Sequence, residues 1–118
     1  MKSILVVEDD FFLAGHIAWL LEEDGFNVVG PVGSLDEARQ LARDEELDGA
    51  LLDVNLHGGR VDEAAEILAL RGVPFVFVTA YSRDNLPEKF RDRELVNKPF
   101  TDQALMRAVQ ALGPTSAR

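Results

Sequence analysis

The chain has 118 residues, enough for one domain with a hydrophobic core, and 47% of them are hydrophobic, which excludes a disordered protein. It carries 21 acidic and 12 basic residues, and this charge of −9 argues against nucleic-acid or anionic-membrane partners held by general electrostatics. The absence of cysteine excludes disulfides and thiolate metal sites. The apolar run before Glu8 is too short for a signal peptide or a membrane span, so we expect a cytoplasmic protein.

Strand and helix signals alternate along the chain. Short apolar runs predict strands at 3–8, 26–32, 48–53, 74–78 and 94–97, and helical periodicity or capping signals predict helices at 11–24, 34–46, 61–71 and 101–112. Ser34 begins a capping box and Thr101 is the expected cap of the last helix. Gly30 and Pro31 interrupt the second strand, which we therefore place at a sheet edge.

The predicted organisation is one α/β domain over 1–118. Its core covers about 2–112, and residues 113–118 form a C-terminal tail. Gly113 and Pro114 are expected to stop the last helix and leave a frayed end. Alternating strands and helices with short connections predict a doubly wound parallel sheet with helices on both faces. Between the fourth and fifth strands, residues 81–93 have only two apolar anchors after Tyr81, which are Leu86 and Phe90, so a helix there would be short and weakly held.

Polar side chains follow four of the predicted strands. Glu8 ends the first strand and Asp9 follows it, Asp53 ends the third, Thr79 follows the fourth and Lys98 the fifth. The carboxyl ends of parallel strands face one crevice, so we expect these groups to meet there. Carboxylates hold a hard divalent cation, whereas a hydroxyl and an ammonium hold phosphate oxygens. The pattern predicts phosphoryl transfer to an aspartate.

Each feature also has an ordinary interpretation when it is taken alone. Acids at a helix start can be caps, the Thr79 hydroxyl can bond the backbone, and Lys98 can be a solvated surface lysine. Asp53 changes this balance, because crowded carboxylates repel one another unless a cation neutralises them. Mg²⁺ fits best, with Glu8, Asp9 and Asp53 as ligands and the Asn55 backbone carbonyl well placed to add another oxygen.

Lys98 lies between a strand and a turn fixed by Pro99. Such a turn aims the lysine side chain into the crevice, where it can pair with Asp53 when no phosphoryl group is present. We predict that the Lys98–Pro99 peptide bond is cis, because cis prolines concentrate in tight turns.

With these residues in this order, the chain resembles the receiver domains of two-component response regulators over about residues 2–112. The resemblance implies a flavodoxin-like, five-stranded parallel sheet of order 2-1-3-4-5. It implies Asp53 as phosphoacceptor, with Thr79 and Lys98 assisting and Mg²⁺ as cofactor. The phosphoryl group would come from a histidine kinase or a histidine phosphotransfer protein. Such a protein is a phosphorylation switch and not an enzyme with a separate substrate.

Finer motifs resemble one subgroup of stand-alone receivers, typical of alphaproteobacteria, with a Phe-Ala-Thr-Gly-x-Tyr-like motif. They lie at 74–81, 86–87 and 97–100, and Val78 and Ala80 depart from the subgroup pattern at its Ala and Gly. This resemblance implies a partner kinase of the HWE or a related type. Without an output domain, the signal would leave by contact with a downstream protein or by onward phosphotransfer.

Two departures from the general family bear on switching. His57 stands where a proline is usual, and Leu95 stands where a switch aromatic is usual. Tyr81 lies two residues after Thr79, so our hypothesis is that segment 80–93 carries the signal with Tyr81 as its lever. The alternative is that Tyr81 only packs on the sheet edge.

Two other functions remain as alternatives. A Mg²⁺-dependent phosphohydrolase would also form an aspartyl phosphate, but it needs an acid/base aspartate two residues after the nucleophile, where this chain has Asn55. A degenerate receiver acting as a scaffold would be expected to lose acidic or lysine positions, and this chain retains them.

Overall fold

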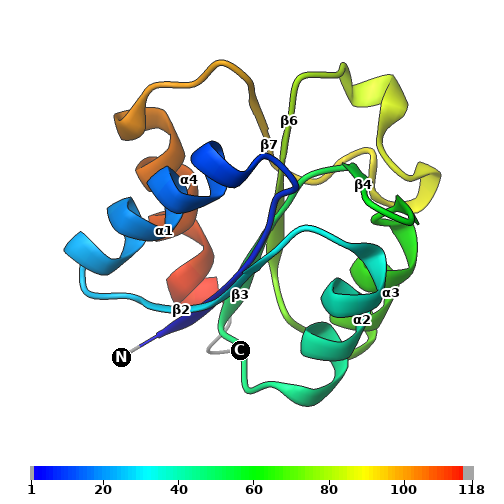
Figure 1. Cartoon of the computed structure of the whole chain (residues 1–118), viewed down its shortest axis with the longest axis horizontal. Coiled ribbons are helices and arrows are strands. Elements are labelled where there is room, and N and C mark those ends of the chain that lie inside the picture. Colours follow the sequence, from blue (N-terminus) through cyan, green and yellow to red (C-terminus); the bar gives the residue numbers. More distant parts are fainter. Residues whose placement is uncertain (1, 116–118) are drawn as a thin grey trace.

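A computed structural model describes the backbone of residues 2–115 and the side chains of residues 2–112. Strands and helices alternate through this range (Figure 1). The elements are β1 Ser3–Val7, α1 Phe11–Glu23, β2 Asn27–Val32, α2 Leu35–Asp44, β3 Gly49–Leu52, β4 Asn55–Leu56, β5 Gly59–Arg60, α3 Asp62–Leu70, β6 Phe75–Thr79, the 3₁₀ turns η1 Arg83–Asn85 and η2 Glu88–Phe90, β7 Leu95–Asn97 and α4 Asp102–Thr115.

The main sheet is parallel, and its strand order is β2-β1-β3-β6-β7. Because β6 and β7 are the fourth and fifth of the predicted strands, this is the predicted order 2-1-3-4-5. The interrupted strand β2 is an edge strand, as predicted. Leu52 of β3 pairs with Val7 of β1 and with Phe77 of β6, so neighbouring strands end close to one level. The residues that follow these strands are therefore delivered to one edge of the sheet.

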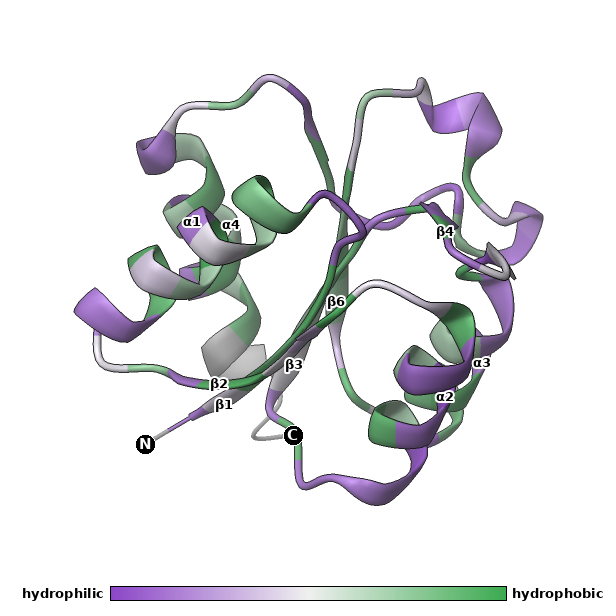
Figure 2. Cartoon of the chain, viewed as in Figure 1, coloured by the Kyte–Doolittle hydropathy of each residue, from purple (hydrophilic) through white to green (hydrophobic). Residues whose placement is uncertain are grey.

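Two helices cover each face of the sheet. Figure 1 shows α1 and α4 on one side and α2 and α3 on the other. Figure 2 shows that the central strands are largely hydrophobic, as expected for strands buried on both faces, whereas much of the connection between β6 and β7 is hydrophilic. Within residues 2–115 there is no helix of the length and apolarity that a membrane crossing requires.

The helix starts follow the predicted caps. The Ser34 side chain accepts a hydrogen bond from Glu37 N, and Thr101 Oγ1 accepts one from Ala104 N. Helix ends agree less well with the sequence. Helix α2 ends at Asp44 rather than near residue 46, and α4 continues to Thr115 past the expected stop at Gly113 and Pro114. A proline removes one hydrogen-bond donor and crowds the carbonyl four residues before it, but Pro114 lies in the last turn, where few helical hydrogen bonds follow it. The rest of the expected frayed tail, residues 116–118, lies outside the described residues.

The connection between β6 and β7 has no α-helix and contains only the single turns η1 and η2. Leu86 and Phe90, the two anchors expected from the sequence, are buried in the core on the α2 and α3 side. The sequence therefore correctly indicated weak helix formation, but these two side chains still fix the connection to the core.

Arginine side chains take over the role that helical N–H groups would have in this connection. Three arginine side chains donate four hydrogen bonds to backbone carbonyls: Arg83 Nη1 to Arg91 O and to Arg93 O, Arg91 Nη2 to Asp84 O, and Arg60 Nη2 to Asn85 O. The Arg93 guanidinium also lies 4.4 Å from the ring centroid of Phe75. The backbone polar groups of this segment are thus partly satisfied by side chains.

Candidate functional site

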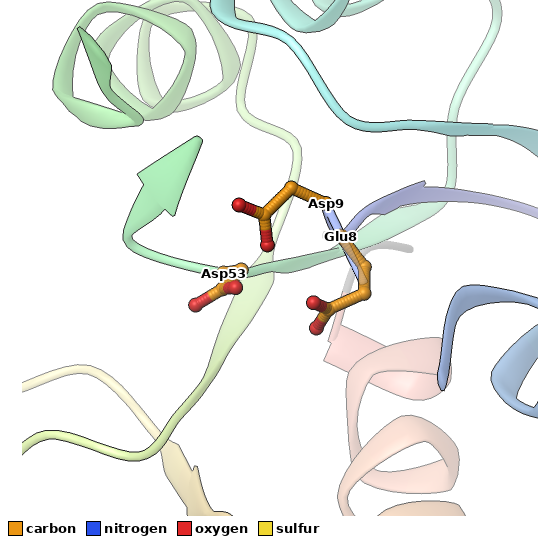
Figure 3. Close-up of side chains that lie close together, drawn as sticks. All are labelled: Glu8, Asp9 and Asp53. Carbon is orange, nitrogen blue, oxygen red and sulfur yellow. The ribbon is translucent and has the colours of Figure 1, made fainter. Parts of the chain in front are cut away.

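Glu8 and Asp53 are fixed by the backbone ladder that continues past β1 and β3. Glu8 N donates to Val32 O at 2.8 Å, and Asp53 N donates to Val7 O at 2.9 Å. Asp9 follows Glu8, and one carboxylate oxygen from each of the three acids lies within 4.8 Å of the others (Figure 3). The structure therefore brings together the three carboxylates that the sequence placed at strand ends.

Lys98 reaches this acid cluster from the turn after β7. Its Nζ lies 2.7 Å from Glu8 Oε1 and 3.2 Å from Asp53 Oδ2. The pairing with Asp53 was predicted, whereas the shorter contact with Glu8 was not. The Lys98–Pro99 peptide bond is cis, as predicted. The ammonium thus lies between two acids that come from different strands.

Burial dominates the electrostatics of the site. It raises the pKa of Glu8 to about 7, against the opposing effects of the Lys98 ammonium and of Asp10 N, which donates to Glu8 Oε2 at 3.0 Å. For Lys98, burial lowers the pKa, but the Glu8 and Asp53 carboxylates outweigh it and the net pKa is raised. When all three acids are ionised, a single ammonium leaves the cluster short of positive charge.

The donor set suits a hard divalent cation. The close ligand atoms are carboxylate oxygens, and Glu8 Oε1 has no other polar partner than Lys98 among the described residues. Asp53 Oδ1 accepts from Val54 N at 2.8 Å, which orients the carboxylate. Oxygen ligands and excess negative charge are what Mg²⁺ requires, so these residues fit that ion.

Thr79 is fully buried at the end of β6, and its Oγ1 accepts a hydrogen bond from Tyr81 N at 3.2 Å. This is the ordinary backbone role of a strand-end hydroxyl, but a hydroxyl that accepts still has its own proton to donate. The Tyr81 residue is 49% exposed. Leu95 is partly buried against the core, where it lies in place of the usual switch aromatic.

The residues after Asp53 form a hairpin of β4 and β5, which was not among the predicted strands. Asn55 begins it and is exposed; a metal-binding role for its carbonyl stays a prediction. Gly58 and Gly59 have positive φ angles of 88° and 142°, and this Gly-Gly pair was the overlooked hairpin signal. The hairpin is tied to the connection between β2 and α2.

The backbone of His57 forms the hydrogen bonds that connect the hairpin to this segment. His57 N donates to Gly33 O at 3.0 Å, and Leu35 N donates to His57 O at 2.9 Å. The proline that is usual at position 57 in the family has no N–H and could not make the first of these bonds. The departure noted in the sequence therefore accompanies a specific backbone contact.

An apolar surface adjoins the acid cluster at the start of α1. Phe11 and Phe12 are 82% and 84% exposed. A cavity of about 440 Å³ runs from Glu8 and Asp9 along this helix to Pro31. The two phenylalanines were not among the predicted site residues, although their position directly after the helix cap Asp10 was the available signal. Exposed aromatic residues beside a site commonly mark a contact surface.

Known proteins resemble this chain over most of its length. The family model described as "Response regulator receiver domain" matches residues 4–110. The transcriptional regulatory protein PdtaR of Mycobacterium tuberculosis is 32% identical over 113 residues, which cover 92% of this chain and 55% of that protein. This chain thus spans about half the length of that curated relative.

Two solved structures show the same fold. The solution structure of SdrG from Sphingomonas melonis Fr1 has a TM-score of 0.82 and 40% identity, covering 95% of this chain and 96% of that chain. The receiver domain of the sensor histidine kinase PA1611 from Pseudomonas aeruginosa has a TM-score of 0.77 and 24% identity, covering 94% and 96%. The PA1611 structure has a magnesium ion coordinated in its active site cleft.

Proposed function

This chain belongs to the response regulator receiver family, and on that premise we propose that Asp53 accepts a phosphoryl group from a histidine kinase or a histidine phosphotransfer protein. The observation that carries the proposal is the position of Asp53. Its carboxylate lies in a cluster with Glu8 and Asp9 and 3.2 Å from the Lys98 ammonium. The site therefore combines a nucleophilic oxygen with groups that can neutralise a phosphoryl group.

Mg²⁺ is the proposed cofactor. The carboxylates of Glu8, Asp9 and Asp53 would hold it, together with the Asn55 carbonyl. When bound, the ion offsets the negative charge of the phosphoryl group and of the carboxylates. The magnesium in the PA1611 receiver supports this proposal.

The chain's own residues supply the remaining steps. The transition state of phosphoryl transfer is loose, so catalysis is mostly positioning and charge neutralisation. Lys98 would exchange its carboxylate partners for a phosphoryl oxygen, and the Thr79 hydroxyl would donate its proton to another. Attack of water on the phosphorus of the acyl phosphate would break its bond to the Asp53 oxygen, release inorganic phosphate and restore the free carboxylate. The protein would thus assist its own phosphorylation and dephosphorylation and act as a switch, without turning over a separate substrate.

The apolar start of α1 suits contact with the phosphodonor. A protein that presents a phosphohistidine must approach Asp53 at the same edge of the sheet, and the cavity beside Phe11 and Phe12 is continuous with the acid cluster. A donor surface with apolar residues around its histidine would match the exposed Phe11 and Phe12. We further propose that the chain belongs to the Phe-Ala-Thr-Gly-x-Tyr subgroup, is cytoplasmic and receives its phosphoryl group from a kinase of the HWE or a related type. The sequence motif around Thr79 supports the subgroup.

For the output, segment 80–93 would carry the signal, with Tyr81 as its lever. Tyr81 is half-exposed, and its backbone N–H donates a hydrogen bond to the Thr79 hydroxyl, which holds the turn between the two residues. A phosphoryl group adds roughly −1.5 to −2 charges at the site, which would draw the Thr79 hydroxyl and shift this turn. A downstream protein would read the changed surface.

A Phos-tag gel with acetyl phosphate and Mg²⁺ tests the proposal. The wild-type chain should give a shifted band, and Asp53→Asn should give none. Asp44→Asn removes an exposed carboxylate and should be labelled like the wild type. Labelling of Asp53→Asn near the wild-type level would place the phosphoryl group elsewhere. A scaffold would not shift at all, and a phosphohydrolase would turn over phosphate monoesters.

A further inference from the structure

Asn97 joins the ends of the two strands that bring Thr79 and Lys98 to the site. It is the last residue of β7 and pairs in register with Thr79. Its Nδ2 lies 3.1 Å from Tyr81 O and 3.4 Å from Thr79 O. Both partners are carbonyl oxygens, so the NH₂ group of the amide must face them. Thr79 O also accepts from Lys98 N at 2.9 Å, which makes this corner a single hydrogen-bonded unit.

Through this contact, both backbone polar groups of Tyr81 are held by side chains of strand-end residues. Tyr81 N donates to Thr79 Oγ1 at 3.2 Å, and Tyr81 O accepts from Asn97. The Thr79 hydroxyl is thereby fixed as an acceptor and keeps its proton for another partner. Because a threonine side chain has alternative rotamers, a loss of this turn would free the hydroxyl to leave its position.

We propose that Asn97 is a positioning residue for phosphoryl uptake: its amide holds the turn at Thr79–Tyr81 so that the Thr79 hydroxyl is ready for a phosphoryl oxygen. The inference rests on the proposed function of Asp53 and adds a residue to it. Asn97 touches neither Asp53 nor the acid cluster in any described hydrogen bond, and it acts through Thr79.

The test measures the rate of Asp53 labelling by acetyl phosphate at fixed Mg²⁺. Asn97→Ala removes the donor and should lower the rate two- to tenfold, the range that one neutral hydrogen bond supports. Asn97→Asp should lower it further, because it sets a carboxylate against two carbonyl oxygens. The matched control is Asn27→Asp. Asn27 begins β2 at the other end of the sheet and donates to Ser3 Oγ at 3.0 Å. Its replacement adds the same charge and should leave the rate unchanged.

A double-mutant cycle separates positioning from general support of the fold. In a Thr79→Val background there is no hydroxyl to position, so Asn97→Ala should change the labelling rate less than it does with Thr79 present. An equal or larger change in that background, or a wild-type rate for Asn97→Ala, would overturn the proposal for Asn97. If the wild-type chain is not labelled on Asp53, the proposed function itself fails, which is a separate result.

Discussion

The acid cluster (Glu8, Asp9 and Asp53) and segment 81–93 lie at the same edge of the sheet but are held in different ways. Glu8 and Asp53 are placed by backbone hydrogen bonds that extend the strand ladder, and both are nearly buried. Segment 81–93 has two 3₁₀ turns, two buried anchors and arginine side chains that donate to its carbonyls. Phosphoryl transfer requires reacting groups in fixed positions, whereas signalling requires a segment whose conformation can change at a small cost in free energy.

This difference indicates which region should respond to ligand binding and which should change conformation. In the acid cluster Glu8 and Asp53 are buried and Asp9 is exposed, and such a cluster with unbalanced charge responds strongly to protons, metal ions and a phosphoryl group. A segment held by exposed side-chain contacts responds to small displacements, because each contact contributes little. We therefore expect large global effects from changes in the acid cluster and local effects from changes in segment 81–93.

The first prediction concerns pH and the acid cluster. Burial raises the pKa of Glu8 to about 7, so the folded chain holds a proton that the unfolded chain releases above its ordinary value of 4.5. Without Mg²⁺, stability should therefore rise as pH falls from 7.5 toward 5, relative to Glu8→Gln, by at most roughly 3 kcal/mol. Urea unfolding of both proteins at several pH values measures this. Parallel profiles would show that Glu8 is ionised throughout this range in the folded chain.

The second prediction concerns Mg²⁺, which should relieve the repulsion within the acid cluster. At ten times its dissociation constant the ion should add about 1.4 kcal/mol and raise the melting temperature. Asp9→Ala should remove this response, while Asp44→Ala, which changes an exposed acid on α2, should retain it. Thermal melts with and without Mg²⁺ decide, and a full response in Asp9→Ala would place the metal outside the cluster.

The third prediction tests whether segment 80–93 carries the signal. Hydrogen exchange with and without beryllofluoride, a phosphoryl mimic, should change most between Ala80 and Arg93, by about tenfold if local opening shifts by about 1.4 kcal/mol. Helices α1 and α2 serve as internal references because both are packed on the core. The idea fails if the largest change falls on either helix, and the alternative that Tyr81 only packs at the edge then gains support.

The sequence predicted the sheet and the meeting of the polar groups well because both follow from buried apolar runs. Once each run is a parallel strand, the residues after it must lie at the carboxyl edge, so Glu8, Asp53 and Lys98 converge. The strand order came from the family resemblance, and the structure has the same order.

The sequence did not reveal the contacts that depend on side-chain direction. Arg60 bonds the carbonyl of Asn85, 25 positions away, and Asn97 bonds that of Tyr81. Neither pair has a fixed spacing or periodicity. Every residue also has a backbone carbonyl, so the residue type does not indicate which carbonyl accepts the hydrogen bond. Likewise, the sequence does not indicate that the Lys98 ammonium lies closer to Glu8 than to Asp53, because this depends on the conformation of a flexible side chain.

The smallest expected effect comes from Arg60, which links the hairpin after Asp53 to segment 81–93. Its Nη2 donates to Asn85 O at 2.9 Å, at the end of η1. Arg60→Gln should speed amide exchange at 83–86 two- to tenfold, because one exposed hydrogen bond contributes little, and should barely move the melting temperature.

Arg39→Gln is the matched control for this change. Arg39 is exposed to a similar degree and pairs with carboxylates on α2 and α3, away from segment 81–93, so exchange at 83–86 should not change. If Arg60→Gln leaves exchange at 83–86 unaltered, the buried anchors Leu86 and Phe90 alone hold the segment. If it instead lowers the global stability as much as changes in the acid cluster do, the two regions form one cooperative unit and the contrast between them is lost.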